Sequence, residues 1–193
     1  MSDDKKAKIS KCLEITYNDM TTTINNNLYE IGIDEVGRGP MFGRVYCAAV
    51  ILPKEGNFKY DLMKDSKKFN SKNKIQEVAQ YIKENCIAWS IEYQDERTID
   101  NINILQSTYQ AMHNSITNIL KQDTLKNYYL LLDGNSFKPY MRINKNTETI
   151  EQLPHICIEG GDNKYCSIAA ASILAKVERD SYIAQLCQEY PKL

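Results

Sequence analysis

Apolar residues occur along this chain in short blocks separated by polar segments, and the period inside each block distinguishes strands from helices. Short runs rich in β-branched and aromatic residues, bounded by glycine, proline or charged residues, are typical of strands. The run over 45–52 is apolar without interruption and is closed by Pro53, which predicts a strand buried on both faces. In all, strands are predicted over 29–36, 45–52, 86–93, 128–133 and 155–158.

Two segments instead carry apolar residues at intervals of three and four, which is the period of an amphipathic helix. The spacing predicts a helix over 74–83 and a longer one over 103–120. A helix of small residues is predicted from about Asn163 to beyond Leu186, after the pair Gly160-Gly161. The charged segment 59–71 and the polar segment 136–152 are interpreted as loops.

The order of these elements predicts the fold class. Strands come first and then alternate with helices, which favours an α/β domain with a central mixed β-sheet flanked by helices. The polar segment 1–27, which ends in three asparagines, is predicted to be a flexible leader outside the core. Residues 28–193 are predicted to form the single folded domain.

Composition narrows the class of protein. The net charge of −1 excludes a basic coat over the whole surface but permits a local basic cleft. The six cysteines have no Cys-x-x-Cys spacing, which favours a reducing compartment. The chain has no apolar run of membrane-spanning length, and its start does not resemble a signal peptide. We therefore expect a cytoplasmic protein with no membrane partner.

The decapeptide over 31–40 is the most informative stretch of the chain. A predicted strand ends in two adjacent carboxylates, Asp34 and Glu35, and Gly37-Arg38-Gly39 follows at once. Adjacent carboxylates repel each other, so a bound cation would stabilise them. Glycines on both sides of an arginine allow close approach of the main chain and place a positive charge beside it. The pattern indicates a metal-dependent site that meets a polyanion.

Two further carboxylates stand at the ends of predicted elements. Asp133 ends the apolar run 128–133 where α/β proteins often bind ligands, although an aspartate before a glycine is also common in ordinary turns. Asp162 precedes a predicted helix and, taken alone, is better interpreted as an N-cap. With Asp34 and Glu35 they favour a hard cation, Mg²⁺ or Mn²⁺. His113 and His155 are the only histidines and are interpreted as structural or exposed, so no histidine and cysteine cluster points to zinc.

Six ordered motifs resemble those of the ribonuclease HII family, the type 2 ribonucleases H. They span roughly residues 29–190, and the first and the last are the most recognisable. The motifs are Asp34-Glu35-Val36-Gly37-Arg38-Gly39-Pro40, Asp65-Ser66-Lys67-Lys68, Asn103-Ile104-Leu105 with Ala111-Met112, Asp133-Gly134-Asn135, Gly161-Asp162 through Lys164, and the helix from Ser167 to Asp180.

The resemblance implies an RNase H-like fold and a two-metal endoribonuclease. Such an enzyme hydrolyses RNA in RNA–DNA hybrids and incises duplex DNA 5′ of embedded ribonucleotides, leaving 5′-phosphate and 3′-hydroxyl ends. It implies Mg²⁺ or Mn²⁺ as cofactor and a monomeric chain. The resemblance assigns the metal ligands and catalytic groups to Asp34, Glu35, Asp133 and Asp162, contact with the ribose 2′-hydroxyl to Gly37, Arg38 and Gly39, and phosphate contacts to Lys67 and Lys68. Lys176 is a weaker candidate, for contact with either a phosphate or a carboxylate.

The chain also departs from the family pattern. Arg44 replaces a common proline, Phe42 is bulkier than usual, and a glycine at 160 or 161 stands where many relatives have a basic residue. Relatives usually continue past this end with a tyrosine-containing motif that stacks on the sugar at the cleavage junction. From this difference we expect weak, salt-sensitive cleavage at single ribonucleotides. The alternatives are a catalytically weak nucleic-acid-binding relative and another two-metal nuclease of the RNase H-like superfamily, such as a resolvase or integrase core.

Overall fold

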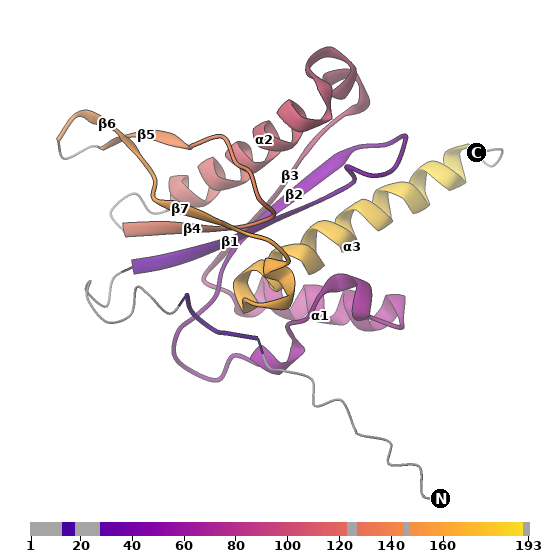
Figure 1. The fold of residues 1–193 in the computed structure, drawn as a ribbon. Helices are drawn as coiled ribbons and strands as arrows, with labels where there is room; N and C mark the ends of the chain where they lie inside the picture. Colours follow the sequence, from indigo (N-terminus) through magenta and orange to yellow (C-terminus); the bar gives the residue numbers. More distant parts are fainter. Residues whose placement is uncertain (1–12, 18–27, 123–126, 145–146, 191–193) are drawn as a thin grey trace, which may run out of the picture.

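The fold is built on a five-stranded mixed sheet (Figure 1). The computed structural model describes residues 13–17, 28–122, 127–144 and 147–190. All five predicted strands are confirmed, with small shifts at their ends. The elements, in chain order, are β1 (Leu28–Val36), β2 (Val45–Ile51), α1 (Lys72–Asn85), β3 (Ala88–Gln94), α2 (Glu96–Gln122), β4 (Asn127–Asp133), β5 (Met141–Asn144), β6 (Thr149–Gln152), β7 (His155–Ile158) and α3 (Cys166–Glu189).

The strand order of the large sheet is β3-β2-β1-β4-β7. The first three strands form an antiparallel meander, whereas β4 runs parallel to both β1 and β7. In the register of the central pair, Ile31 lies beside Leu130 and Ile33 beside Leu132. The carboxyl ends of β1 and β4 therefore lie at the same edge of the sheet, which brings together residues that are 99 positions apart in sequence.

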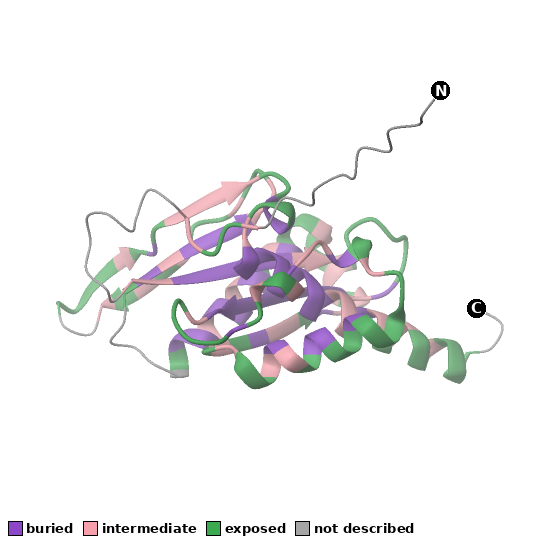
Figure 2. Ribbon diagram, turned by 90° about the horizontal axis from the view of Figure 1, so that it is seen from below, coloured by how far each residue is buried: buried purple, intermediate pink, exposed green. Residues whose placement is uncertain are grey.

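Helices cover both faces of the sheet, with α1 and α3 on one side and α2 on the other (Figure 1). Alternate residues of β2 show why both faces need a cover. Ala48 and Val50 pack against α1 and α3, whereas Cys47 and Ala49 pack on the α2 side. Figure 2 shows that burial is concentrated in the sheet and the first half of α3, while the last turns of α3 are exposed.

The central contact of the fold is the approach of α3 to β1. Gly32 lies directly under the first turn of α3, and a Cβ at this position would lie 2.1–2.5 Å from backbone atoms of Ser167 and Ile168. The helix presents Ala169, Ala170 and Ala171, all fully buried, at the start of its packed segment. Small residues on both elements thus allow the helix to lie against the strand that ends in Asp34 and Glu35.

Several boundaries differ from the sequence-based predictions. The segment 136–152, interpreted as a loop, contains the antiparallel hairpin β5–β6, whose exposed Ile143 and Ile150 pair across the strands. Because this hairpin projects from the domain, its apolar residues do not mark a buried face. The predicted loop 59–71 contains two short 3₁₀ turns. The predicted helix from 163 begins only at Cys166, after a separate 3₁₀ turn that holds Asp162.

The long helix α2 is interrupted at Asn103. This residue has φ 67° and ψ 165°, and its side-chain oxygen accepts a hydrogen bond from the backbone N–H of Gln106 at 3.1 Å. Asn103 therefore caps the second segment, which begins where the helical period predicted. The first helical segment of α2, residues 96–102, was not predicted from the spacing of apolar residues.

The predicted leader 1–27 lies mostly outside the described residues, but Leu13–Tyr17 is described and contacts the domain. Leu13 packs against the core between α1 and α3, and Glu14 forms a β-bridge with Tyr165. The backbone N–H of Tyr17 donates to the carboxylate of Glu30 at 3.2 Å.

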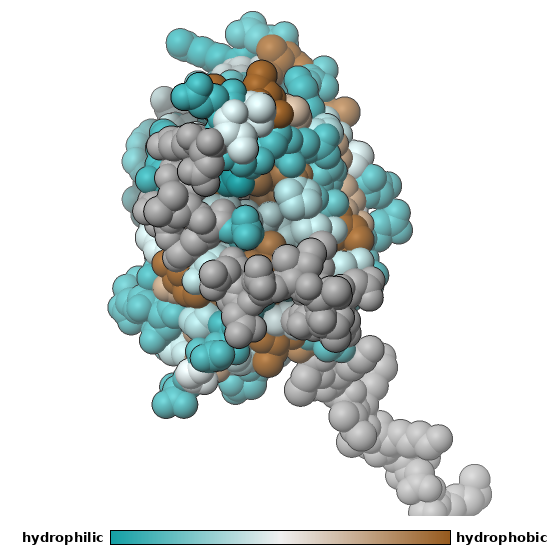
Figure 3. Space-filling view, turned by 90° about the vertical axis from the view of Figure 1, so that its left-hand side faces the viewer, coloured by the Kyte–Doolittle hydropathy of each residue, from teal (hydrophilic) through white to brown (hydrophobic). Residues whose placement is uncertain are grey.

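At the end of the molecule seen in Figure 3, hydrophilic and hydrophobic side chains are mixed on the surface. Within the described residues, no helix is both long and apolar enough to cross a membrane.

Candidate active site

Asp34 and Asp133 occupy the edge of the sheet where β1 and β4 end. Each follows the registered pair Ile33 and Leu132 by one residue, so the two carboxylates stand side by side on adjacent parallel strands. Asp34 is buried, and its Oδ1 accepts the backbone N–H of Glu35 at 2.7 Å. Asp133 is half-buried, and its Oδ1 accepts the backbone N–H of Gly161 at 2.6 Å.

Glu35 follows Asp34 and therefore begins on the opposite face of β1. Its Oε1 lies 3.2 Å from Nη1 of Arg38, which forms an ion pair across the turn. The two side chains of this ion pair differ in exposure, because that of Glu35 is 16 % exposed and that of Arg38 is 49 % exposed. The guanidinium is thus held beside the carboxylates with about half of its side chain open to solvent.

Asp162 reaches the same region from the 3₁₀ turn before α3. Gly160, with φ 62°, begins this turn, and Gly161 donates the hydrogen bond to Asp133. Asp162 is buried, and its Oδ1 accepts Nδ2 of Asn163 at 2.9 Å. The interpretation of Asp162 as the N-cap of α3 is wrong, because Tyr165 occupies that position and makes no side-chain cap.

The electrostatics of the four carboxylates show that their charges are mutually unfavourable. Burial raises the pKa of Asp34 well above its ordinary value, and repulsion from Glu35 and Asp133 raises it further. Burial also raises the pKa of Glu35 and of Asp162, with Asp133 again contributing repulsion to both. Arg38 opposes this shift at Glu35, and Lys67 opposes it at Asp162. The cluster therefore concentrates more negative charge than its neighbours neutralise.

The donor set fits a hard divalent cation in chemistry and in charge. All four side chains offer carboxylate oxygens, and a dication would relieve the repulsion that, after burial, raises the pKa of Asp34, Glu35 and Asp162. Among the described residues, no group of three or more histidine, cysteine or acidic side chains is already arranged around a common point as a metal site. The four carboxylates are near enough to repel one another but do not form a ready-made coordination shell. Asp34 and Asp133 each hydrogen-bond to a backbone N–H. Such bonds use carboxylate oxygens that a cation would otherwise share.

The Gly37-Arg38-Gly39 turn lies directly after β1, but its two glycines have different surroundings. Gly37 is buried with φ 108°, and a Cβ there would lie 2.6 Å from the backbone oxygen of Arg44. Gly39 is exposed, and among the described residues nothing lies within 4 Å of a Cβ placed on it. Gly37 is therefore required by the loop itself, whereas Gly39 leaves a free approach from outside.

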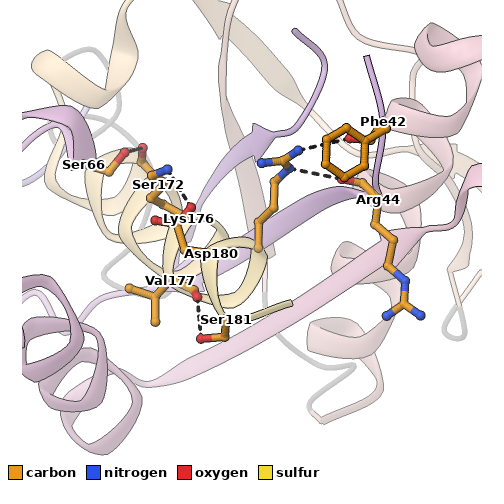
Figure 4. Close-up of polar contacts among 9 residues, drawn as sticks. Phe42, Arg44, Ser66, Ser172, Lys176, Val177, Asp180 and Ser181 are labelled. Carbon is orange, nitrogen blue, oxygen red and sulfur yellow. Dashed lines mark hydrogen bonds and ion pairs between the residues drawn. The ribbon is translucent and has the colours of Figure 1, made fainter. Parts of the chain in front are cut away.

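The predicted phosphate-binding lysines separate into two groups. Lys67 and Lys68 are exposed on the turn before α1 and lie beside Asp162, since Lys67 lowers the pKa of Asp162 and Lys68 Nζ donates to Asn163 Oδ1. Lys176 lies on α3, and its Nζ pairs with Asp180 Oδ1 at 2.7 Å (Figure 4). The structure thus brings Lys67 and Lys68 close to Asp162. Lys176 instead contacts a carboxylate of its own helix, that of Asp180.

Sequence reasoning missed the side chains that support the carboxylates. Ser172 of α3 hydrogen-bonds to the carboxylate of Asp34, and its Oγ lies 3.0 Å from Oγ of Ser66 (Figure 4). Asn163 bridges Asp162 and Asp65, with Nδ2 3.3 Å from Asp65 Oδ2. Both residues lie in stretches already singled out as motifs, but short polar residues in a helix or turn carry no pattern that marks such roles.

The class of protein follows from this arrangement. A mixed five-stranded sheet with carboxylates at the adjoining ends of β1 and β4 defines an RNase H-like fold. The Pyrococcus horikoshii ribonuclease H2 structure matches it with a TM-score of 0.68 at 20 % identity, covering 85 % of this chain and 78 % of that one. The structure of Bst-RNase HIII in complex with Mn²⁺ matches with a TM-score of 0.67 at 20 % identity, covering 84 % of this chain and 55 % of that one.

Sequence comparison identifies the family within this class. The family model for ribonuclease HII matches residues 31–192. Ribonuclease HII of Bacteroides thetaiotaomicron is 40 % identical over 87 % of this chain and 76 % of its own length. Ribonuclease HII of Bacteroides fragilis is 42 % identical over 87 % of this chain and 75 % of its own length. The chain belongs to the ribonuclease HII family, whose activity is endonucleolytic hydrolysis of RNA in RNA–DNA hybrids. The resolvase or integrase alternative is thereby excluded.

Proposed function

We propose that the four carboxylates Asp34, Glu35, Asp133 and Asp162 form the catalytic centre of this endoribonuclease. The observation that carries this assignment is their convergence at one sheet edge from three separate segments, where burial raises the pKa of Asp34, Glu35 and Asp162 and repulsion from Asp133 raises it further. A structural ion pair would be arranged to neutralise such charge, whereas a site that binds cations accumulates it.

The chain's own residues bind and orient the reacting groups. Asp34 and Asp133, fixed by backbone N–H groups, and Glu35 and Asp162 would hold two divalent ions, Mg²⁺ or Mn²⁺. The Mn²⁺ complex of the structural relative Bst-RNase HIII supports that choice. When bound, such ions supply the positive charge that activates water and stabilises the leaving 3′-oxygen. Cleavage on that side of the phosphate leaves 5′-phosphate and 3′-hydroxyl ends.

The turn after β1 would identify the ribose. The open approach to Gly39 allows backbone groups to reach a sugar 2′-hydroxyl, which only RNA carries. The half-exposed Arg38 provides a positive charge for the neighbouring phosphate, and Lys67 and Lys68 provide further charge on the Asp162 side. The proposed substrates are RNA–DNA hybrids and duplex DNA that contains ribonucleotides, which would be incised 5′ of the ribonucleotide.

A substrate panel tests the proposal. In Mg²⁺ or Mn²⁺ we expect the purified chain to cleave an RNA–DNA hybrid and, more weakly and at low salt, a duplex with one ribonucleotide. Mn²⁺ should be at least as effective because it tolerates less regular coordination. An all-DNA duplex is the negative control. Isothermal titration with Mn²⁺ should show binding that Asp133→Asn weakens. Cleavage that survives exhaustive chelation would refute metal dependence, and Mn²⁺ binding without any cleavage would favour the catalytically weak nucleic-acid-binding alternative.

The two glycines of the turn give a second prediction. Gly37→Val is expected to disrupt the loop, because it places a Cβ against the Arg44 carbonyl at a φ of 108°. Gly39→Val should fold normally yet lose ribonucleotide cleavage, because its side chain occupies the path of the sugar. Arg38→Ala should retain more activity than either. Thermal melts of the three variants measure the loss of folding, and cleavage rates measure the loss of activity. Full activity of Gly39→Val would contradict a backbone contact with the ribose.

A further inference from the structure

The loop between β1 and β2, residues 37–44, has few apolar contacts of its own to hold its shape. Met41 is fully exposed and Phe42 is 55 % exposed, so neither large side chain anchors it. Gly37 and Gly43 have φ 108° and 91°, values that a glycine adopts without strain but that do not fix a single conformation. The loop nevertheless carries Arg38 and Gly39 beside the carboxylates, so something else must determine its path.

Arg179 of α3 supplies the missing contacts. Its Nε donates to the backbone oxygen of Arg44 at 3.3 Å, and its Nη2 donates to the backbone oxygen of Phe42 at 3.4 Å (Figure 4). The residue is only 8 % exposed. Within the described parts of the chain its guanidinium pairs with no carboxylate. A buried cation is costly, and here it is compensated by two loop carbonyls.

The same guanidinium also lies against the glycines at both ends of the loop. A Cβ on Gly37 would lie 2.8 Å from Nε of Arg179, and one on Gly43 would lie 3.6 Å from Nη2. One planar group thus contacts the loop where it leaves β1 and where it enters β2. The guanidinium donates to the two carbonyls from two separate nitrogens held in a fixed planar fork, a geometry that the single nitrogen of a lysine ammonium on a flexible stem does not reproduce.

One turn along α3, Tyr182 extends this attachment. The guanidinium of Arg44 stands between the rings of Tyr93 and Tyr182, 4.2 Å from each ring centroid. The hydroxyl of Tyr182 donates to Glu96 Oε1 at 2.6 Å, which links the arrangement to the start of α2. Arg179 and Tyr182 lie on the same face of α3. Arg179 therefore holds the end of the loop through the backbone oxygen of Arg44, and Tyr182 holds it through the side chain of Arg44.

We propose that Arg179 is a positioning residue that sets the 37–44 loop and, through it, the preference of the enzyme for ribose over deoxyribose. The inference rests on the proposed role of this loop in contacting the 2′-hydroxyl. Arg179 does not touch the reacting atoms. It determines where the backbone around Gly39 stands relative to the carboxylates, so its loss should impair recognition of the sugar more than the formation of the metal site.

The test compares Arg179→Met, which keeps a long apolar stem, with Arg179→Lys, which keeps the charge but not the fork. Ser181→Ala on the exposed side of α3 is the matched control, since its hydroxyl donates to the backbone oxygen of Val177 within the same helix (Figure 4). Dissociation constants are measured in Ca²⁺ for a duplex with one ribonucleotide and for its all-DNA counterpart. Cleavage kinetics in Mg²⁺, Mn²⁺ titration and thermal melts are recorded for each variant.

We expect both Arg179 variants to lose about tenfold in the ribonucleotide-to-DNA binding ratio and to raise KM more than they lower kcat, while Mn²⁺ affinity is retained. Arg179→Lys should not recover the ratio. An unchanged ratio in a folded Arg179→Met protein would overturn the inference while leaving the proposed function intact. Absence of any preference in the unsubstituted protein would instead refute the role of the loop. Failure of both variants to fold would show that Arg179 serves the whole fold, which also overturns the inference.

Discussion

Replacing Asp34 by Asn is expected to abolish cleavage while making the metal-free protein more stable. Asparagine preserves the volume of the side chain but removes the charge that would bind a cation, and we expect kcat to fall by roughly 10³-fold or more, equivalent to ~4 kcal/mol of transition-state stabilisation. The gain in stability follows because burial and repulsion from Glu35 and Asp133 raise the pKa of Asp34, so the ionised form opposes folding. Cleavage assays and thermal melts in chelator measure the two effects.

The same shift predicts how stability depends on pH. A carboxyl group whose pKa is raised in the folded protein contributes stability below its unfolded pKa of about 3.9 and loses that contribution as pH rises through the folded value. The metal-free protein should therefore lose stability as pH rises from about 3.9 through the raised pKa of folded Asp34, and Asp34→Asn should reduce this loss. Asp61→Asn, at an exposed position, is the control for a simple change in net charge. Near-normal turnover by Asp34→Asn would remove Asp34 from the catalytic centre.

Replacing Gly32 by Val is expected to be the most damaging change to the fold. A Cβ at this position would lie 2.1 Å from the carbonyl carbon of Ser167, 2.4 Å from its oxygen and 2.5 Å from the nitrogen of Ile168. These are backbone atoms of α3, so no side-chain rotation relieves the clash and the helix must move away from β1. We expect a loss of about 3 kcal/mol or more in the free energy of unfolding, at or beyond the upper end for overpacked cores.

Chemical denaturation with far-UV circular dichroism measures this loss, with Gly39→Ala as the control. Gly39 also lies close to the end of β1, but among the described residues nothing stands within 4 Å of its added Cβ, so its stability should barely change. Because α3 carries Ser172, which bonds to Asp34, a Gly32→Val protein that still folds should also lose activity. Native stability in Gly32→Val would show that β1 and α3 do not pack as closely as described.

The sequence by itself determined the strands of the large sheet, α1 and the second segment of α2, because burial on one side of a regular element or on both leaves a recognisable apolar pattern in the chain. It also determined α3 apart from its start, from the run of small residues. It also determined the family, since six motifs occur in order, and hence the four carboxylates as candidates. Each of those motifs is local. The pair Asp34-Glu35 and the turn Gly37-Arg38-Gly39 are both readable within a single decapeptide.

The tertiary structure alone decided what depends on residues far apart in the chain. The hairpin β5–β6 was missed because its apolar residues are exposed and so follow no burial pattern. The bond from Ser172 to Asp34 joins positions 138 residues apart, and the contacts of Arg179 with the backbone oxygens of Phe42 and Arg44 span a similar separation. Backbone acceptors are the same at every position in the chain. No sequence pattern can therefore indicate which carbonyls a buried guanidinium will reach, and that choice is made only when α3 packs across the end of β1.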